Sequence, residues 1–282
     1  MADAATPWLA AVAIGFDATA LIAIGLALHA TFVVEAARVR GYLFASLVAA
    51  ILAFGFAIMK LALVSSELGA GFADAFNLST LGLAWSALAR ADLALAIGTL
   101  LIAAGAAMRL AWLASVGALT MAAAFGLTGH TQGITNPAEA PAIVALHVVI
   151  AAFWVAAPIS LRPSRTISDP DLMTRLARFS TLAVVAIPVL VLAGLWLAFR
   201  ILGGLEPLVS TPYGKLILAK LAAAILAIGM GALNKTMIPN MIARDGAHGR
   251  RWLHMTLTVE TISFAAAILA VALATTAWPP AE

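Results

Sequence analysis

Eight separate runs of apolar residues, each long enough to cross a lipid bilayer, constrain the fold of this chain most strongly. A bilayer core is about 30 Å thick, so a spanning helix needs about 20 mostly apolar residues. The runs lie at about 8–34, 41–64, 79–107, 110–128, 140–161, 176–202, 212–237 and 252–277. Loops with charged residues, prolines and glycines separate them. We therefore expect an all-α fold: one integral membrane domain over residues 1–282, a bundle of eight transmembrane helices.

The composition agrees with a multi-pass membrane protein and excludes other classes. Hydrophobic residues make up 63% of the chain and charged residues 10%, whereas a soluble domain is about half apolar. The net charge of +3 arises from basic residues in short loops, which favours the lipid bilayer as a partner over nucleic acid. The chain has no cysteine, so disulfides and thiolate metal ligands are excluded.

The distribution of charge between alternate loops predicts the topology. One set of loops holds the basic residues Arg38, Arg40, Arg109, Arg162, Arg165, Arg175, Arg178, Lys235, Arg244, Arg250 and Arg251. The positive-inside rule places these loops in the cytoplasm and both termini in the periplasm, for a protein of a bacterial inner (plasma) membrane. The start, MADAATPW, lacks the basic region of a cleaved signal peptide, so we expect the first run to be retained.

Several ionisable side chains are predicted to lie within spans at a similar depth, in the periplasmic half of the bilayer. They are Asp17, Lys60, Arg90, Asp92, His147 and Lys220. A charge inside a span costs at least about 2.5 kcal/mol on insertion scales, so these residues need an explanation. One explanation is mutual neutralisation that holds helices together, and the other is a polar pocket that admits a cation. Three bases against two acids do not suit a hard divalent cation.

Two histidines near the predicted periplasmic ends of the fourth and fifth spans are the strongest candidates for a metal site. His130 lies in the loop, and His147 lies about 9 Å below Pro141 on the next helix. Neutral imidazole suits copper and zinc, and a thioether suits Cu(I). Methionines on the same side supply candidate thioethers. The predicted metal ligands are His130, His147, Met121 and Met59.

A second group of soft-metal ligands lies in the predicted cytoplasmic segment NKTMIPNMIARDGAHGRRWLHM. The candidate exit residues there are Met237, Met241, His248 and His254. An amphipathic loop with ordinary methionine usage explains the same pattern, because methionine is a common filler of apolar surfaces. Both explanations stay open at this point.

The second half of the chain resembles a known family. The GH at 129–130, LHVVIAAFWVAAPISL, the run from ARFSTLAVV to GMGALNK and RRWLHMTLTVETI are similar to the copper resistance protein D family (CopD/PcoD) of bacterial inner-membrane proteins. The resemblance covers about 125–277, whereas the N-terminal four-helix part, about 8–128, matches only in size and layout. It implies copper movement from periplasm to cytoplasm, often with a periplasmic CopC-like partner. It also implies roles for His130 and His147 and, more loosely, for Lys220, Asn234 and Glu260.

Three functions are consistent with these patterns. The first is copper transport, with Cu(I) as the expected ion and the membrane potential as the driving force, about 2.3 kcal/mol per 100 mV for a monovalent cation. The second is a membrane b-type cytochrome with haem between histidines such as His130, His147 and His29. The third is a copper-delivery or assembly factor that does not transport. No hydrolase motif occurs, so we expect no enzymatic activity.

Overall fold

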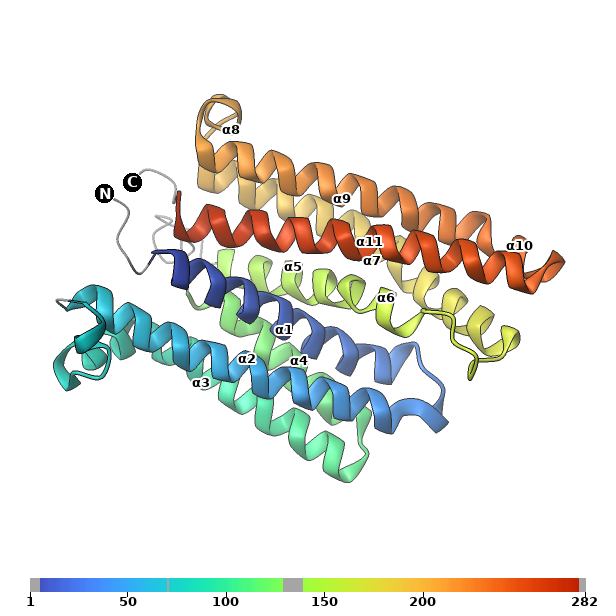
Figure 1. The fold of residues 1–282 in the computed structure, drawn as a ribbon, viewed down its shortest axis with the longest axis horizontal. Coiled ribbons are helices and arrows are strands. Elements are labelled where there is room, and N and C mark those ends of the chain that lie inside the picture. The colour runs from blue at the N-terminus through green and yellow to red at the C-terminus, as the bar shows by residue number, and fades with distance from the viewer. Residues whose placement is uncertain (1–5, 70, 129–138, 279–282) are drawn as a thin grey trace.

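The computed structural model describes residues 6–69, 71–128 and 139–278, and over these residues it contains helices and no strand. The long helices run side by side in an elongated bundle (Figure 1). They are α1 (Thr6–Phe32), α2 (Val39–Leu68), α3 (Leu78–Met108), α4 (Ala111–Gly126), α5 (Ala140–Val155), α7 (Asp169–Leu202), α9 (Pro212–Thr236) and α11 (Gly246–Thr276). The short helices are η1 (Ala36–Arg38), η2 (Phe72–Asp74), α6 (Ala157–Ser160), α8 (Glu206–Ser210) and α10 (Ile238–Arg244).

In the described part of the chain, seven helical segments are long and apolar enough to cross a membrane. They are Pro7–Phe32, Ala36–Leu68, Leu78–Met108, Ala140–Ser160, Asp169–Leu202, Pro212–Thr236 and Gly246–Thr276. The predicted fourth span corresponds to α4, whose 16 residues give a helix about 24 Å long. That is shorter than a bilayer core of about 30 Å. The all-α multi-pass character is confirmed, and the eighth span remains a prediction.

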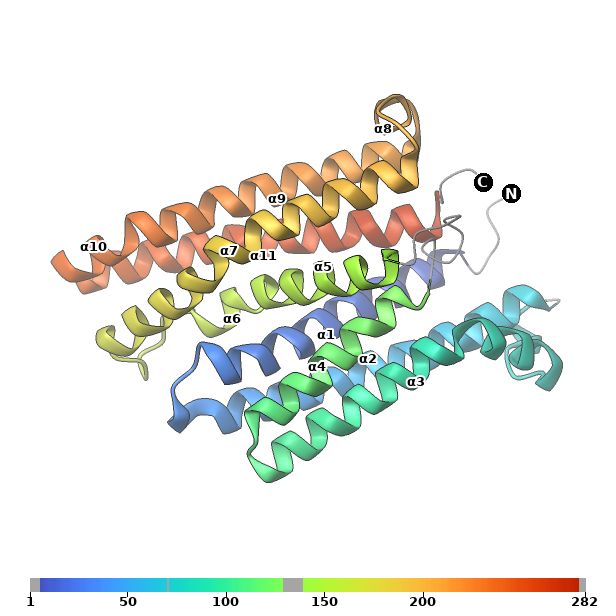
Figure 2. The ribbon, with the colours of Figure 1, turned by 180° about the vertical axis from the view of Figure 1, so that it is seen from behind.

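Alternate connections gather at the two ends of the bundle. The α1–α2, α3–α4, α6–α7 and α10–α11 connections lie at one end, which we call the basic end, in both views (Figures 1 and 2). The α2–α3 connection and α8 lie at the opposite end. Helix α1 begins and α11 ends at that opposite end. The basic loops predicted for the cytoplasm are thus on one side of the bundle, and their placement in the cytoplasm remains a prediction.

Two helices begin earlier than the apolar runs predict. Helix α7 begins at Asp169 rather than near 176, and the Ser168 side chain caps it by accepting from the Asp171 backbone N–H. Helix α11 begins at Gly246 rather than near 252, with Asp245 as its side-chain cap. A cap of this kind satisfies backbone donors that the first turn leaves free. The helices therefore extend past the apolar runs into polar turns.

The predicted fifth span is broken. Helix α5 ends at Val155 and α6 begins at Ala157, with Pro158 in its first turn. Proline has no backbone N–H and clashes with the preceding turn, so it interrupts helices. The break lies toward the basic end, where α5 and α6 face α1 (Figure 1).

Helix α1 lies at the centre of the bundle, in contact with α2, α4, α5 and α11. Gly25 makes the approach to α5 possible, because a Cβ there would lie only 2.1 Å from the Ala152 carbonyl oxygen. Small residues let membrane helices approach closely in this way. Through α1, the N-terminal helices pack against the C-terminal ones.

Candidate functional site

The His147 imidazole lies between α5 and α7, in a space left by a glycine. A Cβ at Gly194 would lie 3.1 Å from the His147 Cε1, a close contact that would push the ring by a few tenths of an ångström. The ring also lies close to the backbone of Leu190. Its Nδ1 is buried and, among the residues that the structure describes, has no hydrogen-bond partner. A buried ring nitrogen without a partner is costly, and the nitrogens of a neutral imidazole are common metal ligands.

Charged side chains continue from His147 across the bundle. Lys220 acts electrostatically on His147 and interacts with Asp17. Asp17 in turn interacts with Lys60, and Lys60 with Asp92. None of these charged pairs comes within the 4.0 Å of a direct salt bridge in the described part of the chain. The two acids and two lysines therefore balance one another in charge at longer range.

A small cavity accompanies this row of charges. It measures about 30 Å³ and lies beside Lys60 and Asp92, bounded by Phe16, Phe125 and Thr128 among others. A cavity needs about 10–15 Å³ of such space to hold a water, so this one admits a water or two. Arg90, which the sequence places in the same layer, is exposed.

The other predicted metal ligands occupy different surroundings. His130 falls outside the described residues. Met121 is fully buried, and a Cβ at Gly98 of α3 would lie 2.4 Å from its Cγ, so the thioether packs into the α3–α4 contact. Met59 is 51% exposed on α2. Within 6–69, 71–128 and 139–278, no three His, Asp or Glu side chains are grouped to hold a metal. The four-ligand site therefore remains a prediction.

The predicted exit residues at the basic end face different neighbours. The His254 Nε2 accepts a hydrogen bond of 2.8 Å from the Arg162 guanidinium. Met241 packs against the apolar core, whereas Met237 and His248 are exposed. Their role as an exit for a soft metal also remains a prediction.

A network at the basic end was not predicted from the sequence, and its first member is His29. The His29 Nε2 lies 2.8 Å from the Phe153 carbonyl oxygen and its Nδ1 lies 2.6 Å from the Ser160 Oγ. A carbonyl only accepts, so Nε2 carries the proton, and Nδ1 accepts from the Ser160 hydroxyl. Both ring nitrogens are therefore used within the protein, which leaves His29 unsuited to bind haem.

Arg175 is the second member of the network. It is fully buried and binds the Glu35 carboxylate through Nε and Nη2. Its Nη1 donates to the Ser160 carbonyl at 2.9 Å and to the Tyr42 hydroxyl at 3.2 Å. The charge pattern of the sequence groups Arg175 with the loop cations, because it lies near the end of a basic stretch. The structure instead uses it to join α7 to α6 and α2.

The Glu35–Arg175 pair predicts acid sensitivity. Hydrogen bonds from Arg175 hold the pKa of Glu35 below its ordinary value of 4.5. A lowered pKa in the folded state stabilises the protein fully above about pH 4.5, and this contribution is lost as the pH falls through the lowered pKa. We expect the unfolding temperature of the purified protein to fall on acidification in this range, and to fall less in Glu35→Gln. Equal slopes in scanning fluorimetry would contradict this.

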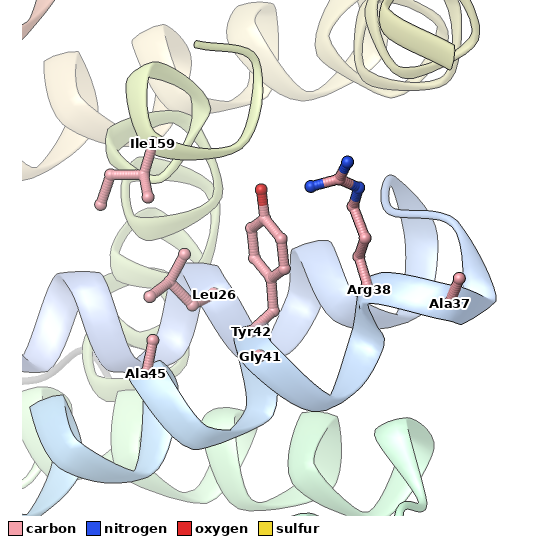
Figure 3. Close-up of a pocket in the computed structure, with 7 residues that line it drawn as sticks. All are labelled: Leu26, Ala37, Arg38, Gly41, Tyr42, Ala45 and Ile159. Carbon is pink, nitrogen blue, oxygen red and sulfur yellow. The ribbon is translucent and has the colours of Figure 1, made fainter. Parts of the chain in front are cut away.

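A groove of about 380 Å³ at the basic end lies next to this network (Figure 3). It is lined by Leu26, Ala37, Arg38, Gly41, Tyr42, Ala45 and Ile159. The Tyr42 hydroxyl and the Arg38 guanidinium point the same way, away from the helix that carries Tyr42 (Figure 3). Arg38 donates to the carbonyl and hydroxyl of Thr166, and Tyr42 accepts from Arg175. The polar groups of the groove thus have partners within the protein.

Two residues that the sequence singled out are brought together: Asn234, near the C-terminal end of α9, and Glu260, near the midpoint of α11. Glu260 is 2% exposed, and its Oε1 accepts a 2.7 Å hydrogen bond from the Asn234 Nδ2. The Asn234 Oδ1 accepts from the Thr256 hydroxyl. The Trp154 Nε1 lies near the Glu260 carboxylate but outside hydrogen-bond geometry, and it has no partner in the described structure.

The segment that contains Asn234 and Glu260 matches a known protein family. Residues 173–274 match the family model of copper resistance protein D (CopD). The match begins in α7 and ends in α11, and it includes Arg175, Asn234 and Glu260 but not His147. Comparison with curated proteins and with solved structures gives no match. The resemblance predicted from the sequence is confirmed for the matched segment.

Proposed function

With a copper resistance protein D match over α7 to α11 as the premise, we propose that this chain carries copper across a bacterial inner membrane, from periplasm to cytoplasm. The match itself indicates a copper-handling membrane protein. The observation that supports a site within the bundle is the buried, unpartnered Nδ1 of His147. An imidazole nitrogen of this kind suits Cu(I), the ion that we expect to be carried.

The proposed capture site lies between the matched helices and the rest of the bundle. His147 on α5 faces Gly194 of α7, and α7 belongs to the matched segment. We propose His130, Met121 and Met59 as further ligands. The nearby Asp17 offsets the charge of Lys220, which would otherwise repel a cation at His147.

The proposed route ends at the basic end of the bundle. A monovalent cation that moves inward gains about 2.3 kcal/mol per 100 mV of membrane potential, which drives uptake without ATP. Release would occur near Met237, Met241, His248 and His254. A periplasmic CopC-like protein would deliver copper to the opposite end, beside the start of α5.

The test of this proposal is the substitution His147→Ala. We expect purified His147→Ala to bind copper at least about tenfold more weakly than the parent. Loss of a residue that only hydrogen-bonds to a metal ligand typically lowers metal affinity by about 10–100-fold, and loss of the ligand itself should cost at least as much. Met108→Ala, an exposed methionine of α3 outside both predicted ligand groups, is the control for copper affinity and should leave it unchanged. If His147→Ala binds copper as tightly as the parent, the site is assigned to the wrong residue.

Cellular copper decides between transport and delivery. In copper-limited cells, cytosolic copper measured by elemental mass spectrometry should rise with the parent and fall to the empty-vector level with His147→Ala. If all three strains match while the purified parent still binds copper, the protein delivers copper within the periplasm and does not import it.

A further inference from the structure

Glu260 is an acidic residue buried at the middle of a transmembrane helix. It lies near the midpoint of α11, about 21 Å from the first residue of that helix, and is 2% exposed. An ionised side chain at this depth costs at least about 2.5 kcal/mol, so such residues are paired with a cation, neutral or functional. The surroundings of Glu260 distinguish these cases.

No cationic side chain in the described part of the chain faces the Glu260 carboxylate. The groups that act on it are the Asn234 amide of α9 and the Trp154 indole of α5. On the neighbouring helices, His29 of α1 is bound to Ser160 and Phe153. Asp17, the other titratable residue of α1, interacts with Lys60 and Lys220. Further along, Lys235 of α9 and Arg244 of α10 are exposed, and His254 of α11 accepts from Arg162.

The orientation of Asn234 limits what Glu260 can bind. The Asn234 Nδ2 faces the Glu260 carboxylate, and the Asn234 Oδ1 faces the Thr256 hydroxyl. An N–H donor facing the carboxylate does not coordinate a metal ion. The Trp154 indole on the other helix also offers only an N–H. The cluster therefore presents two donors to one carboxylate, with no oxygen directed at a shared cation.

The unpartnered Trp154 indole fits a change in the protonation of Glu260. The Trp154 Nε1–H has no partner in the described structure and lies near the Glu260 carboxyl group, which it can reach by a small rotation. An ionised carboxylate accepts a hydrogen bond more strongly than the neutral acid does. A hydrogen bond from Trp154 would therefore favour the ionised state.

We propose that Glu260 is a proton-binding site within the membrane, with Trp154 as the residue that stabilises its ionised form, and that the proton is the ion coupled to copper movement. The step is one reversible proton transfer between the carboxylate and the aqueous phase, and no other bond changes. The coupling part rests on the proposed function, whereas the proton site does not.

The proton site is tested without copper. Infrared spectra of the purified full-length protein should contain the carbonyl band of a protonated acid in apolar surroundings, and the band should disappear as the pH is raised. Glu260→Gln should abolish the band, and Glu206→Gln, an exposed control, should retain it. Persistence of the band in Glu260→Gln would overturn the assignment, as would the absence of any such band in the parent.

The role of Trp154 is tested by its effect on the titration midpoint. Trp154→Phe keeps an aromatic ring against Phe264 but removes the donor that favours ionised Glu260. Loss of a donor to the ionised form should raise the midpoint of the infrared titration by about one pH unit. A residue with only a packing role would leave the midpoint unchanged, and that result would remove Trp154 from the proposal.

Coupling is tested in liposomes that contain the protein and a pH-sensitive dye. Addition of Cu(I) should cause copper entry and proton movement together in the parent, and Glu260→Gln should lose the proton movement. Copper entry without proton movement in the parent would refute the coupling. If no copper enters, the proposed function fails, while the infrared titration still decides whether Glu260 binds a proton.

Discussion

Arg175→Ala is expected to destabilise the folded protein by about 3 kcal/mol, more than any other single change considered. Removal of one partner of a buried ion pair typically costs 3–5 kcal/mol, because the other charge stays buried without compensation. Arg175 is fully buried and the Glu35 side chain is 24% exposed, which places the expected cost at the lower end of that range. The Ser160 carbonyl and the Tyr42 hydroxyl lose a partner as well.

A neighbouring arginine supplies the control for Arg175. Arg178 lies one turn further along α7 and is exposed, so Arg178→Ala should change the free energy of unfolding little. Arg175→Lys should fall between the two, since a lysine keeps the charge but cannot bind the carboxylate through two nitrogens. Denaturant or thermal unfolding in detergent measures all three. Equal stability of Arg175→Ala and Arg178→Ala would show that the network contributes nothing to the fold.

Gly25→Ala has the second largest expected effect. The added Cβ would lie 2.1 Å from the Ala152 carbonyl oxygen and 2.6 Å from the Ala156 Cβ, so α1 and α5 must separate. Overpacking of a well-packed interior typically costs 1–3 kcal/mol. Because the clash is with backbone, which gives way less than a flexible side chain, we expect a cost in the upper half of that range, about 2.5 kcal/mol.

The matched control for this change is Gly55→Ala on α2. A Cβ at Gly55 meets nothing within 4 Å, so the substitution should leave stability unchanged or raise it slightly. Unfolding of the purified variants in the same detergent compares them directly. If Gly25→Ala is as stable as Gly55→Ala, the close contact of α1 with α5 is not required by the fold.

The sequence predicts the helices well because the requirement behind them is local. In lipid, the backbone of a run of about 20 apolar residues must form its hydrogen bonds within the run. Such a run is therefore helical whatever its neighbours are. The starts of α7 and α11 were placed several residues late because Ser168 and Asp245 cap polar turns ahead of the apolar runs. Helix α4 covers most of the predicted run 110–128, and it is too short for a span because the run itself is short.

The contacts between helices could not be predicted in the same way. Glu260 and His147 were identified because ionisable groups within a span are costly. Their partners, Asn234 and the space at Gly194, lie on other helices, and no local pattern links them. The Glu35–Arg175 pair spans 140 positions in the sequence, so only the approach of α7 to the α1–α2 connection reveals it.

The break between α5 and α6 also fixes the position of α1 along α5. In the hydrocarbon core, a backbone carbonyl that loses its helical N–H donor must accept a hydrogen bond from another group, such as a nearby side chain. At this break the Phe153 carbonyl accepts from His29, and the Ser160 carbonyl just beyond it accepts from Arg175. Each of these two carbonyls holds one side chain from another helix at a fixed height along the bundle axis. The interruption between α5 and α6 therefore sets the positions of α1 and α7 along the bundle axis.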